Sequence, residues 1–407
     1  MITKLAEKTA NALSFTEEAT TKWNDRLVGS PDCLACGDFL EQSFRKFCDT
    51  TQKHTFFVRP GAFLGFIDFG VVFYFLTLAA LWMQYLAMAV LLATIPILIT
   101  VFQFFFYKDF ISFLYPKKQG QNIVGFIEPT GEMKQQIIVS AHHDSAHIFN
   151  FLDKAPETFP KKMLIANGAT FGIAIITWGL WIAGLLGFQS SMATYLAAGF
   201  FTLLSYNVGQ MWFFYDKKGT PGAGDNLICT AIAMEVGKYF SAKKIEGTGL
   251  KHTRVVVASW DAEECGLRGA RAYVGAHLPQ LKSVPTYNFN LECMYDVRQL
   301  GFLTSDLNSF VPLSEEMVDD CLAVSQHLGY SVKKVPFPFL AGGTDAAEFA
   351  KVGIEATTLA GMSWVDKQGK PAYHTPRDTI EAVDDKAVAA SIHIAIEYVL
   401  KKERAYD

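Results

Sequence analysis

Long apolar segments interrupt an otherwise mixed pattern of hydrophobic and polar residues along the chain. They cover residues 62–82, 84–107, 164–188 and 192–215, and they form two pairs joined by very short connections. Each segment is about 21–25 residues long, which is enough for a helix to cross the hydrocarbon core of a membrane. The pattern therefore predicts four transmembrane helices in two hairpins. Apolar core helices, or re-entrant hairpins that stay within the membrane, are the alternatives.

The rest of the chain alternates between two other patterns. Residues 121–128, 135–141 and 254–260 are rich in β-branched side chains and predict strands, whereas residues 226–240 have the spacing of a helix. Strands that alternate with helices predict an α/β fold with a mostly parallel (mixed) sheet and helices on both faces.

The two hairpins are interpreted as insertions into a single α/β domain. The polar segments before, between and after the hairpins share one strand–helix pattern, and no low-complexity segment separates them. We expect the α/β domain to comprise residues 1–60, 109–162 and 216–407, with the hairpins at 61–108 and 163–215.

Basic residues predict the orientation of the hairpins. Lysine and arginine flank the outer ends of both hairpins, and the hairpin tips carry no charge. Each hairpin returns the chain to the side from which it came, so every polar segment is expected on one side of the membrane. The positive-inside rule makes that side the cytoplasm. We expect an integral, multi-pass protein in contact with the lipid bilayer, with the α/β domain and both termini in the cytoplasm.

Composition narrows the partners and the compartment. The formal net charge of −4 gives no indication of a nucleic-acid partner. Residues 1–26 are polar and do not resemble a signal peptide, and the seven cysteines show no disulfide framework, which favours a reducing compartment. Cys33 and Cys36 form a CxxC pair without a second pair, so they are interpreted as ordinary helix cysteines rather than a zinc or redox site. The oligomeric state stays unknown.

Acidic residues and histidine lie at the expected carboxyl ends of strands, where ligands bind in parallel sheets. His142, the pair Glu263 and Glu264, and Glu292 each end or follow an apolar run. Asp144 lies two residues after His142, so its carboxylate can orient the imidazole. Adjacent carboxylates after an apolar strand require compensating cations or protons. Glu264 is therefore expected to bind metal and Glu263 to face a water molecule, with an exposed acidic turn as the alternative.

Two further candidates lie in loops. Asp225 follows a Gly-Ala-Gly segment at the start of a predicted helix, where it is either a metal ligand or a helix N-cap. His374 lies in the turn-rich segment 373–379, whose Pro376 and Asp378 are expected to fix the shape of the loop. Two histidines and three carboxylates are enough to hold two divalent ions around one shared carboxylate.

Taken in order, these motifs resemble those of the co-catalytic two-zinc aminopeptidases, the clan MH metallopeptidases. That family includes glutamate carboxypeptidase, the glutaminyl cyclases and the non-catalytic transferrin receptor. The resemblance covers nearly all the polar sequence and implies a membrane-embedded member of the family. It is carried by residues 26–31, 142–144, 222–226, 263–269, 290–292 and 373–376.

The resemblance implies a metal-binding role for five residues. Asp225 would bridge two divalent ions, expected to be zinc. His142 and Glu292 would complete one site, and Glu264 and His374 the other. Glu292 stands where the family more often has aspartate, so the geometry or metal preference of its site is in doubt.

The resemblance also implies catalytic roles. Glu263 would be the general base that activates water, Asp144 would support the first histidine, and Tyr373 would donate a hydrogen bond to the developing oxyanion. Two other positions depart from the family pattern. Gly224 replaces a frequent acidic residue, and Ala346 lacks the imidazole of the family's Ser-Asp-His segment, which puts substrate recognition in doubt.

The expected activity is that of an aminopeptidase, a metallopeptidase that hydrolyses N-terminal residues of peptides. A one-zinc acyltransferase of the glutaminyl-cyclase type and an inactive membrane scaffold or receptor are the alternatives. A carboxypeptidase, or an amidase acting on lipid-linked amides, also fits the resemblance. The hairpins suggest apolar or membrane-derived peptides as substrates, unless they only anchor the domain.

Overall fold

The computed structural model describes residues 2–339, 341–365 and 369–406, which form two compact units. Residues 1, 340, 366–368 and 407, which the sequence places in the α/β domain, lie outside the described residues. Unit 1 comprises Met1–Val58, Lys117–Ile148 and Lys217–Asp407, and unit 2 comprises Arg59–Pro116 and Phe149–Asp216.

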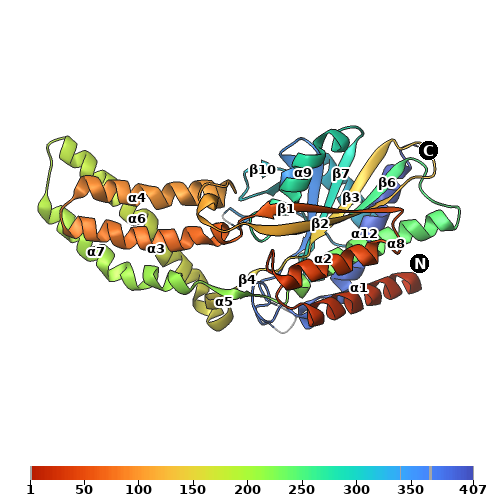
Figure 1. The fold of residues 1–407 in the computed structure, drawn as a ribbon, viewed down its shortest axis with the longest axis horizontal. Coiled ribbons are helices and arrows are strands. Elements are labelled where there is room, and N and C mark those ends of the chain that lie inside the picture. Colours follow the sequence, from red (N-terminus) through yellow and green to blue (C-terminus); the bar gives the residue numbers. More distant parts are fainter. Residues whose placement is uncertain (1, 340, 366–368, 407) are drawn as a thin grey trace. The chain divides into compact units, whose positions relative to one another are not determined.

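Unit 1 is built on an eight-stranded sheet with the order β1-β2-β6-β3-β7-β12-β8-β11 (Figure 1). The pairs β6–β3, β3–β7, β7–β12 and β8–β11 are parallel, whereas β1–β2, β2–β6 and β12–β8 are antiparallel. The predicted mostly parallel, mixed sheet is therefore confirmed. Its strands are β1 (Thr50–Val58), β2 (Lys118–Ile127), β3 (Gln135–His142), β6 (Thr253–Trp260), β7 (Thr286–Met294), β8 (Gly301–Leu303), β11 (Lys333–Val335) and β12 (Glu355–Gly361).

Helices cover both faces of this sheet, because its central strands are apolar on both sides. On β3, Ile137 and Val139 belong to the core with α8 and α12, whereas Ile138 belongs to the core with α9 and α11. Figure 1 shows α9 on the opposite side of the sheet from α8. The helices of unit 1 are α1 (Ile2–Lys22), α2 (Pro31–Phe44), α8 (Ile228–Ile245), α9 (Arg268–Leu281), α10 (Glu315–His327), α11 (Ala346–Ala350) and α12 (Asp385–Glu403).

Both parts of unit 2 are inserted where strands of unit 1 pair. Val58 and Lys118 are cross-strand partners at the end of the β1–β2 ladder, so residues 59–117 take the place of a hairpin turn. The second insertion leaves the chain at β4 (His147–Phe149) and returns at β5 (Tyr215–Gly219), and these two strands pair in a small sheet of their own.

Unit 2 consists of long helices packed around an apolar core that includes Leu81, Ile173 and Phe201. Its outer surface is also apolar, since Leu203 is 78% exposed and Ile175 is 69% exposed. The helices are α3 (Gly61–Trp82), α4 (Leu86–Thr100), α5 (Asn150–Lys154), α6 (Phe159–Leu185) and α7 (Ser191–Gln210), with a π-helical turn at Val101–Phe105.

Among the described residues, three helical segments are long and apolar enough to cross a membrane. They are Gly61–Trp82, Leu86–Phe105 and Pro156–Leu185. The fourth predicted span corresponds to α7, which is helical but carries several polar residues, among them Ser205 and Asn207. Three helices thus have the length and composition that the prediction requires, and the crossing of a membrane by these three and by α7 stays a prediction.

Candidate metal centre

The five predicted ligands meet at the carboxyl edge of the sheet in unit 1. His142 is the last residue of β3, Glu264 follows β6, and Glu292 lies near the end of β7. Asp225 lies in the irregular turn before α8, and His374 lies in the loop that precedes α12. The parallel pairing of β3 with β6 and β7 brings three segments that are distant in the sequence to one edge.

Asp225 lies between two halves of this group. Its Oδ1 atom is 3.4 Å from His142 Nε2, and its Oδ2 atom is 3.3 Å from His374 Nε2. His142 Nε2 is also 3.4 Å from Glu292 Oε1, and His374 Nε2 is 3.5 Å from Glu264 Oε1. Each half therefore contains one imidazole and one carboxylate of its own, and the two halves share the carboxylate of Asp225.

Glu263 lies beside the His142 half. Its Oε2 atom is 3.8 Å from His142 Nε2, and its side chain is about as buried as those of the five predicted ligands. Asp144 contacts both His142 and the turn that carries Glu263 and Glu264. Its carboxylate accepts hydrogen bonds from the backbone N–H groups of Glu263 (3.1 Å) and Glu264 (3.2 Å), and Oδ1 lies 3.3 Å from His142 Nδ1. One buried carboxylate thus orients the imidazole and the turn that carries both glutamates.

Asp378 fixes the loop that carries Asp225. Its two oxygens accept hydrogen bonds from the N–H groups of Gly224 (2.8 Å) and Asp225 (3.1 Å). Position 224 has no room for a side chain, because a Cβ atom there would lie 2.2 Å from Cε1 of Tyr295. The absence of the acidic residue frequent in relatives thus has a steric reason. On the other side, Asn226 Nδ2 donates to the carbonyl of Leu291, next to Glu292.

Burial and charge compete strongly in the group. Burial opposes protonation of His142, but the charges of Glu292 and Glu263 raise its pKa well above the ordinary value. Burial likewise disfavours a charged His374, yet Glu264 and Asp225 raise its pKa to about 10. Burial raises the pKa of Glu292 to about 7, against the opposing effect of His142.

The carboxylates at the centre of the group differ in their titration. Burial disfavours the charged form of Asp225, but the two imidazoles beside its oxygens keep its pKa far below the usual range. Burial raises the pKa of Glu263 well above its ordinary value, and the charges of Glu264 and Glu292 add to that effect. Without a cation, a group with this much buried negative charge has to retain protons.

The residues fit a site for divalent metal. Among the described residues, several buried polar atoms of the group have no hydrogen-bond partner, including His142 Nε2, Asp225 Oδ2 and Glu292 Oε2. Donor atoms of His142, Asp225 and Glu264 lie within 4.8 Å of one another, as do those of His142, Glu263 and Glu292. Imidazole nitrogens and carboxylate oxygens are ligands that zinc accepts in catalytic sites.

A family model matches this part of the chain. Residues 212–399 match the model described as peptidase family M28, and the matched segment contains Asp225, Glu264, Glu292 and His374. This part of the chain belongs to peptidase family M28. The remaining predicted ligand, His142, precedes the matched segment.

Curated relatives agree with the M28 assignment. The chain is 28% identical over 168 residues to a "Probable glutamate carboxypeptidase" of Arabidopsis thaliana, an alignment that covers 39% of this chain and 24% of the relative. It is 26% identical over 200 residues to the aminopeptidase YwaD of Bacillus subtilis, which covers 46% of this chain and 39% of the relative. The chain thus spans well under two thirds of the length of these relatives.

Solved structures share the fold at low sequence identity. A Zn-dependent exopeptidase from Parabacteroides distasonis has 12% identity and a TM-score of 0.56, with 96% of this chain and 97% of the other covered. The glutaminyl cyclase of Porphyromonas gingivalis has 13% identity and a TM-score of 0.55, with 97% and 98% covered. These similarities show that the chain shares the fold of these structures, and they do not distinguish between their reactions.

Arg26 is the residue at the M28 site whose importance the sequence does not reveal. Its guanidinium is fully buried and donates to the backbone carbonyls of His143 (2.8 Å), Trp23 (2.9 Å), Pro221 (2.7 Å) and Gly222 (2.9 Å). These bonds connect the N-terminal segment to the loops that follow His142 and precede Asp225. The only sequence signal is the match of residues 26–31 to a family motif.

Tyr373 and Asp345 also lie close to the M28 centre. The ring of Tyr373 stacks on His374, with 3.9 Å between ring centroids, so the tyrosine is beside a predicted ligand. Its expected hydrogen bond to an oxyanion stays a prediction. Asp345 is fully buried, and neither of its carboxylate oxygens has a hydrogen-bond partner among the described residues. Burial raises the pKa of Asp345 well above its ordinary value, against the opposing effect of His142, and the charge of Glu292 adds to the rise.

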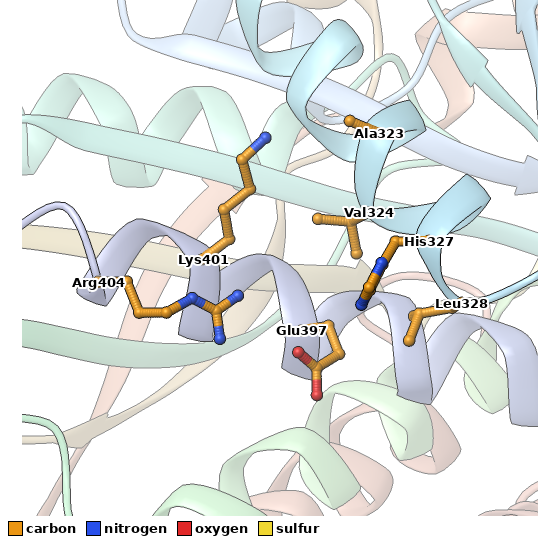
Figure 2. Close-up of a pocket in the computed structure, with 7 residues that line it drawn as sticks. All are labelled: Ala323, Val324, His327, Leu328, Glu397, Lys401 and Arg404. Atoms are coloured by element: carbon orange, nitrogen blue, oxygen red, sulfur yellow. The ribbon is translucent and has the colours of Figure 1, made fainter.

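A surface pocket of about 280 Å³ lies elsewhere on unit 1, between α10 and α12 (Figure 2). In Figure 2 its side chains come from these two helices, and none of the M28 site residues is among them. The pocket therefore plays no part in the metal centre. Its lining residues are Ala323, Val324, His327, Leu328, Glu397, Lys401 and Arg404.

Proposed function

We propose that this protein is a membrane-embedded zinc exopeptidase that uses two metal ions to release N-terminal residues from peptides. The observation that carries the proposal is the position of Asp225, whose two oxygens face the imidazoles of His142 and His374. A buried carboxylate shared by two histidine–carboxylate pairs is suited to two cations rather than one. The M28 match of residues 212–399 supports peptide hydrolysis as the reaction.

The site residues divide the catalytic work. When bound, two zinc ions would lower the pKa of a water molecule and polarise the scissile carbonyl. Glu263, beside the ligands, accepts the proton of that water and passes it to the leaving amine. Asp144 keeps the imidazole of His142 and the turn of Glu263 in place. Asp378 holds the loop of Asp225 through two N–H···O bonds.

Asp345 favours a substrate with a free amino terminus. Its buried carboxylate lacks a hydrogen-bond partner among the described residues and lies within electrostatic range of His142 and Glu292. A buried carboxylate requires a partner of opposite charge or a proton. The ammonium group of a peptide N-terminus supplies such a charge, whereas the carboxylate of a C-terminus would be repelled. We therefore favour an aminopeptidase over a carboxypeptidase.

Unit 2 supports the membrane part of the proposal. Its helices present large apolar side chains outward as well as inward, which a water-soluble unit does not do over so much surface. We propose that it crosses a lipid bilayer and that unit 1 and both termini lie in the cytoplasm. Apolar or membrane-derived peptides would then be substrates, because they partition to the surface where the enzyme is held.

Substitution of the proposed base tests the reaction. Glu263→Gln keeps the size of the side chain and should retain bound zinc while kcat falls by about 10²–10⁴-fold. Glu157→Gln, on a short helical turn of unit 2, is the matched control and should leave kcat unchanged. Turnover by Glu263→Gln at the wild-type rate would contradict the assignment of Glu263 as the general base.

Substrate panels and zinc content separate the other functions. Peptides with a free N-terminus should be cleaved in detergent and the same peptides with an acetylated N-terminus should not. Cleavage of both at equal rates would count against an aminopeptidase. One zinc at the centre together with cyclisation of N-terminal glutamine would favour a cyclase, and bound zinc without turnover of any substrate would favour a scaffold. Equal cleavage of apolar peptides in detergent and in liposomes would argue against a membrane-presented substrate.

A further inference from the structure

A second group of metal-ligating side chains lies in unit 1, apart from the five M28 ligands. Donor atoms of Cys33, His143 and Asp261 lie within 4.8 Å of one another, and all three residues are fully buried. They come from the first turn of α2, from the residue after β3 and from the residue after β6. The folded chain thus supplies partners for Cys33, the first cysteine of the CxxC pair.

In the described part of the chain, the polar atoms of this group are hydrogen-bonded except for one buried ring nitrogen of His143. The Cys33 thiol donates to Asp261 Oδ1 at 3.4 Å, and the backbone N–H of Gln121 donates to Asp261 Oδ2 at 2.9 Å. His143 Nδ1 lies 2.8 Å from Ser259 Oγ, which fixes the orientation of the ring. His143 Nε2 is buried and has no hydrogen-bond partner among the described residues. A buried ring nitrogen in this position is costly unless another group binds it.

From these observations we propose that Cys33, His143 and Asp261, together with Cys36, bind a structural zinc ion. Cys36 follows one turn later on α2 and is equally buried. The two cysteines have the C-x₂-C spacing of zinc ligands, and structural zinc sites are closed sites with four protein ligands. Thiolate together with imidazole selects zinc over magnesium and calcium, which bind through oxygen.

This ion would connect three elements directly behind the catalytic residues. It would connect α2 to the ends of β3 and β6, close in the chain to His142 and Glu263. A site that is entirely buried has to be filled as the protein folds, so its metal content reflects the metal supplied during synthesis. The proposal concerns folding and rigidity, and it holds or fails independently of the peptidase reaction.

Cobalt gives a readout that separates this site from the M28 centre. The full-length protein is produced in zinc-depleted, cobalt-supplemented medium, and its absorption is recorded in detergent. Cobalt bound to a cysteine thiolate has an intense near-ultraviolet charge-transfer band, whereas the five M28 ligands offer only nitrogen and oxygen. We expect the wild-type protein to show the band. A wild-type spectrum without it would overturn the proposal, whatever the variants do.

Serine substitutions locate the source of the band. Cys33→Ser and Cys36→Ser should each weaken or abolish it and, in protein made with zinc, lower the zinc content by about one ion per chain. Cys321→Ser, buried in α10, is the matched control and should change neither quantity. Cys293 is the critical comparison, because it lies beside Glu292. A band that survives Cys33→Ser but disappears in Cys293→Ser would overturn the proposal.

Discussion

Arg26 offers the sharpest test of how the metal centre is held in place. Its guanidinium donates four hydrogen bonds to backbone carbonyls and is fully buried. Hydrogen bonds that involve a charged group contribute about 1.5–3 kcal/mol each. Their sum overstates the effect, because burying the charge has its own cost. For Arg26→Met we expect a loss of about 3–5 kcal/mol, because four carbonyls lose their donor and a buried acceptor without a partner costs about 1–3 kcal/mol.

The loss should be concentrated at the metal centre. Three of the four acceptors, the carbonyls of His143, Pro221 and Gly222, belong to the loop after His142 and to the loop that carries Asp225. Hydrogen–deuterium exchange of these loops should accelerate in Arg26→Met, and the urea midpoint of unit 1 should fall. The exchange rates and the urea midpoint of Arg26→Lys should lie between those of Arg26→Met and the wild type, because an ammonium group provides fewer donors in a less rigid arrangement.

Arg45→Met is the matched control for this prediction. Arg45 is exposed and pairs with Glu41 at 2.5 Å one helical turn away, an interaction that contributes about 0.5 kcal/mol or less. Equal urea midpoints for Arg26→Met and Arg45→Met would refute the reasoning. So would faster exchange across the whole of unit 1 with no preference for the two ligand-bearing loops.

Three other outcomes follow from the described contacts. Removal of metal with a strong chelator should lower the melting temperature of unit 1, and added zinc should restore it, because a ligand at about 100 times its Kd stabilises by about 2.7 kcal/mol. Gly224→Ala should destabilise by about 1–3 kcal/mol through overpacking, whereas Gly275→Ala, in open space on α9, should be neutral or stabilising in thermal unfolding. Burial opposes ionisation of Glu348, but Arg271 lowers its pKa below the ordinary value. The pair of Glu348 and Arg271 should thus stabilise the fold fully above the pKa of a glutamate in the unfolded chain. This stabilisation should be lost as the pH falls through the lower pKa of folded Glu348, so the urea midpoints of wild type and Glu348→Gln should converge in acid.

The sheet and most of the metal centre follow from local patterns. Strands β3 and β6 each contain three consecutive β-branched residues, which predict a strand. The bounds of β6 lie within one residue of the predicted ones. Their carboxyl ends then identify His142 and Glu264 as neighbours, because parallel strands end at one edge of a sheet. The role of these residues in binding metal stays a prediction, although the structure brings them together.

Contacts that depend on strand order could not be predicted. β6 lies between β2 and β3, and this pairing brings Asp261 close to Cys33 and His143. No periodicity indicates which strands become neighbours, so Cys33 looked like an ordinary helix residue. The contacts of Arg26 could not be predicted either. The motif match of residues 26–31 does not indicate that this arginine is buried and bonded to four backbone carbonyls.

The pairing of Val58 with Lys118 limits how often the first insertion can cross a membrane. Both ends of residues 59–117 are held side by side by one antiparallel ladder, so they are on the same side of any bilayer. The number of crossings between them must be even. The same parity applies to the second insertion, whose ends are held by the pairing of β4 with β5. If α6 crosses, α7 has to cross back despite its polar residues, and those residues would then face other helices rather than lipid.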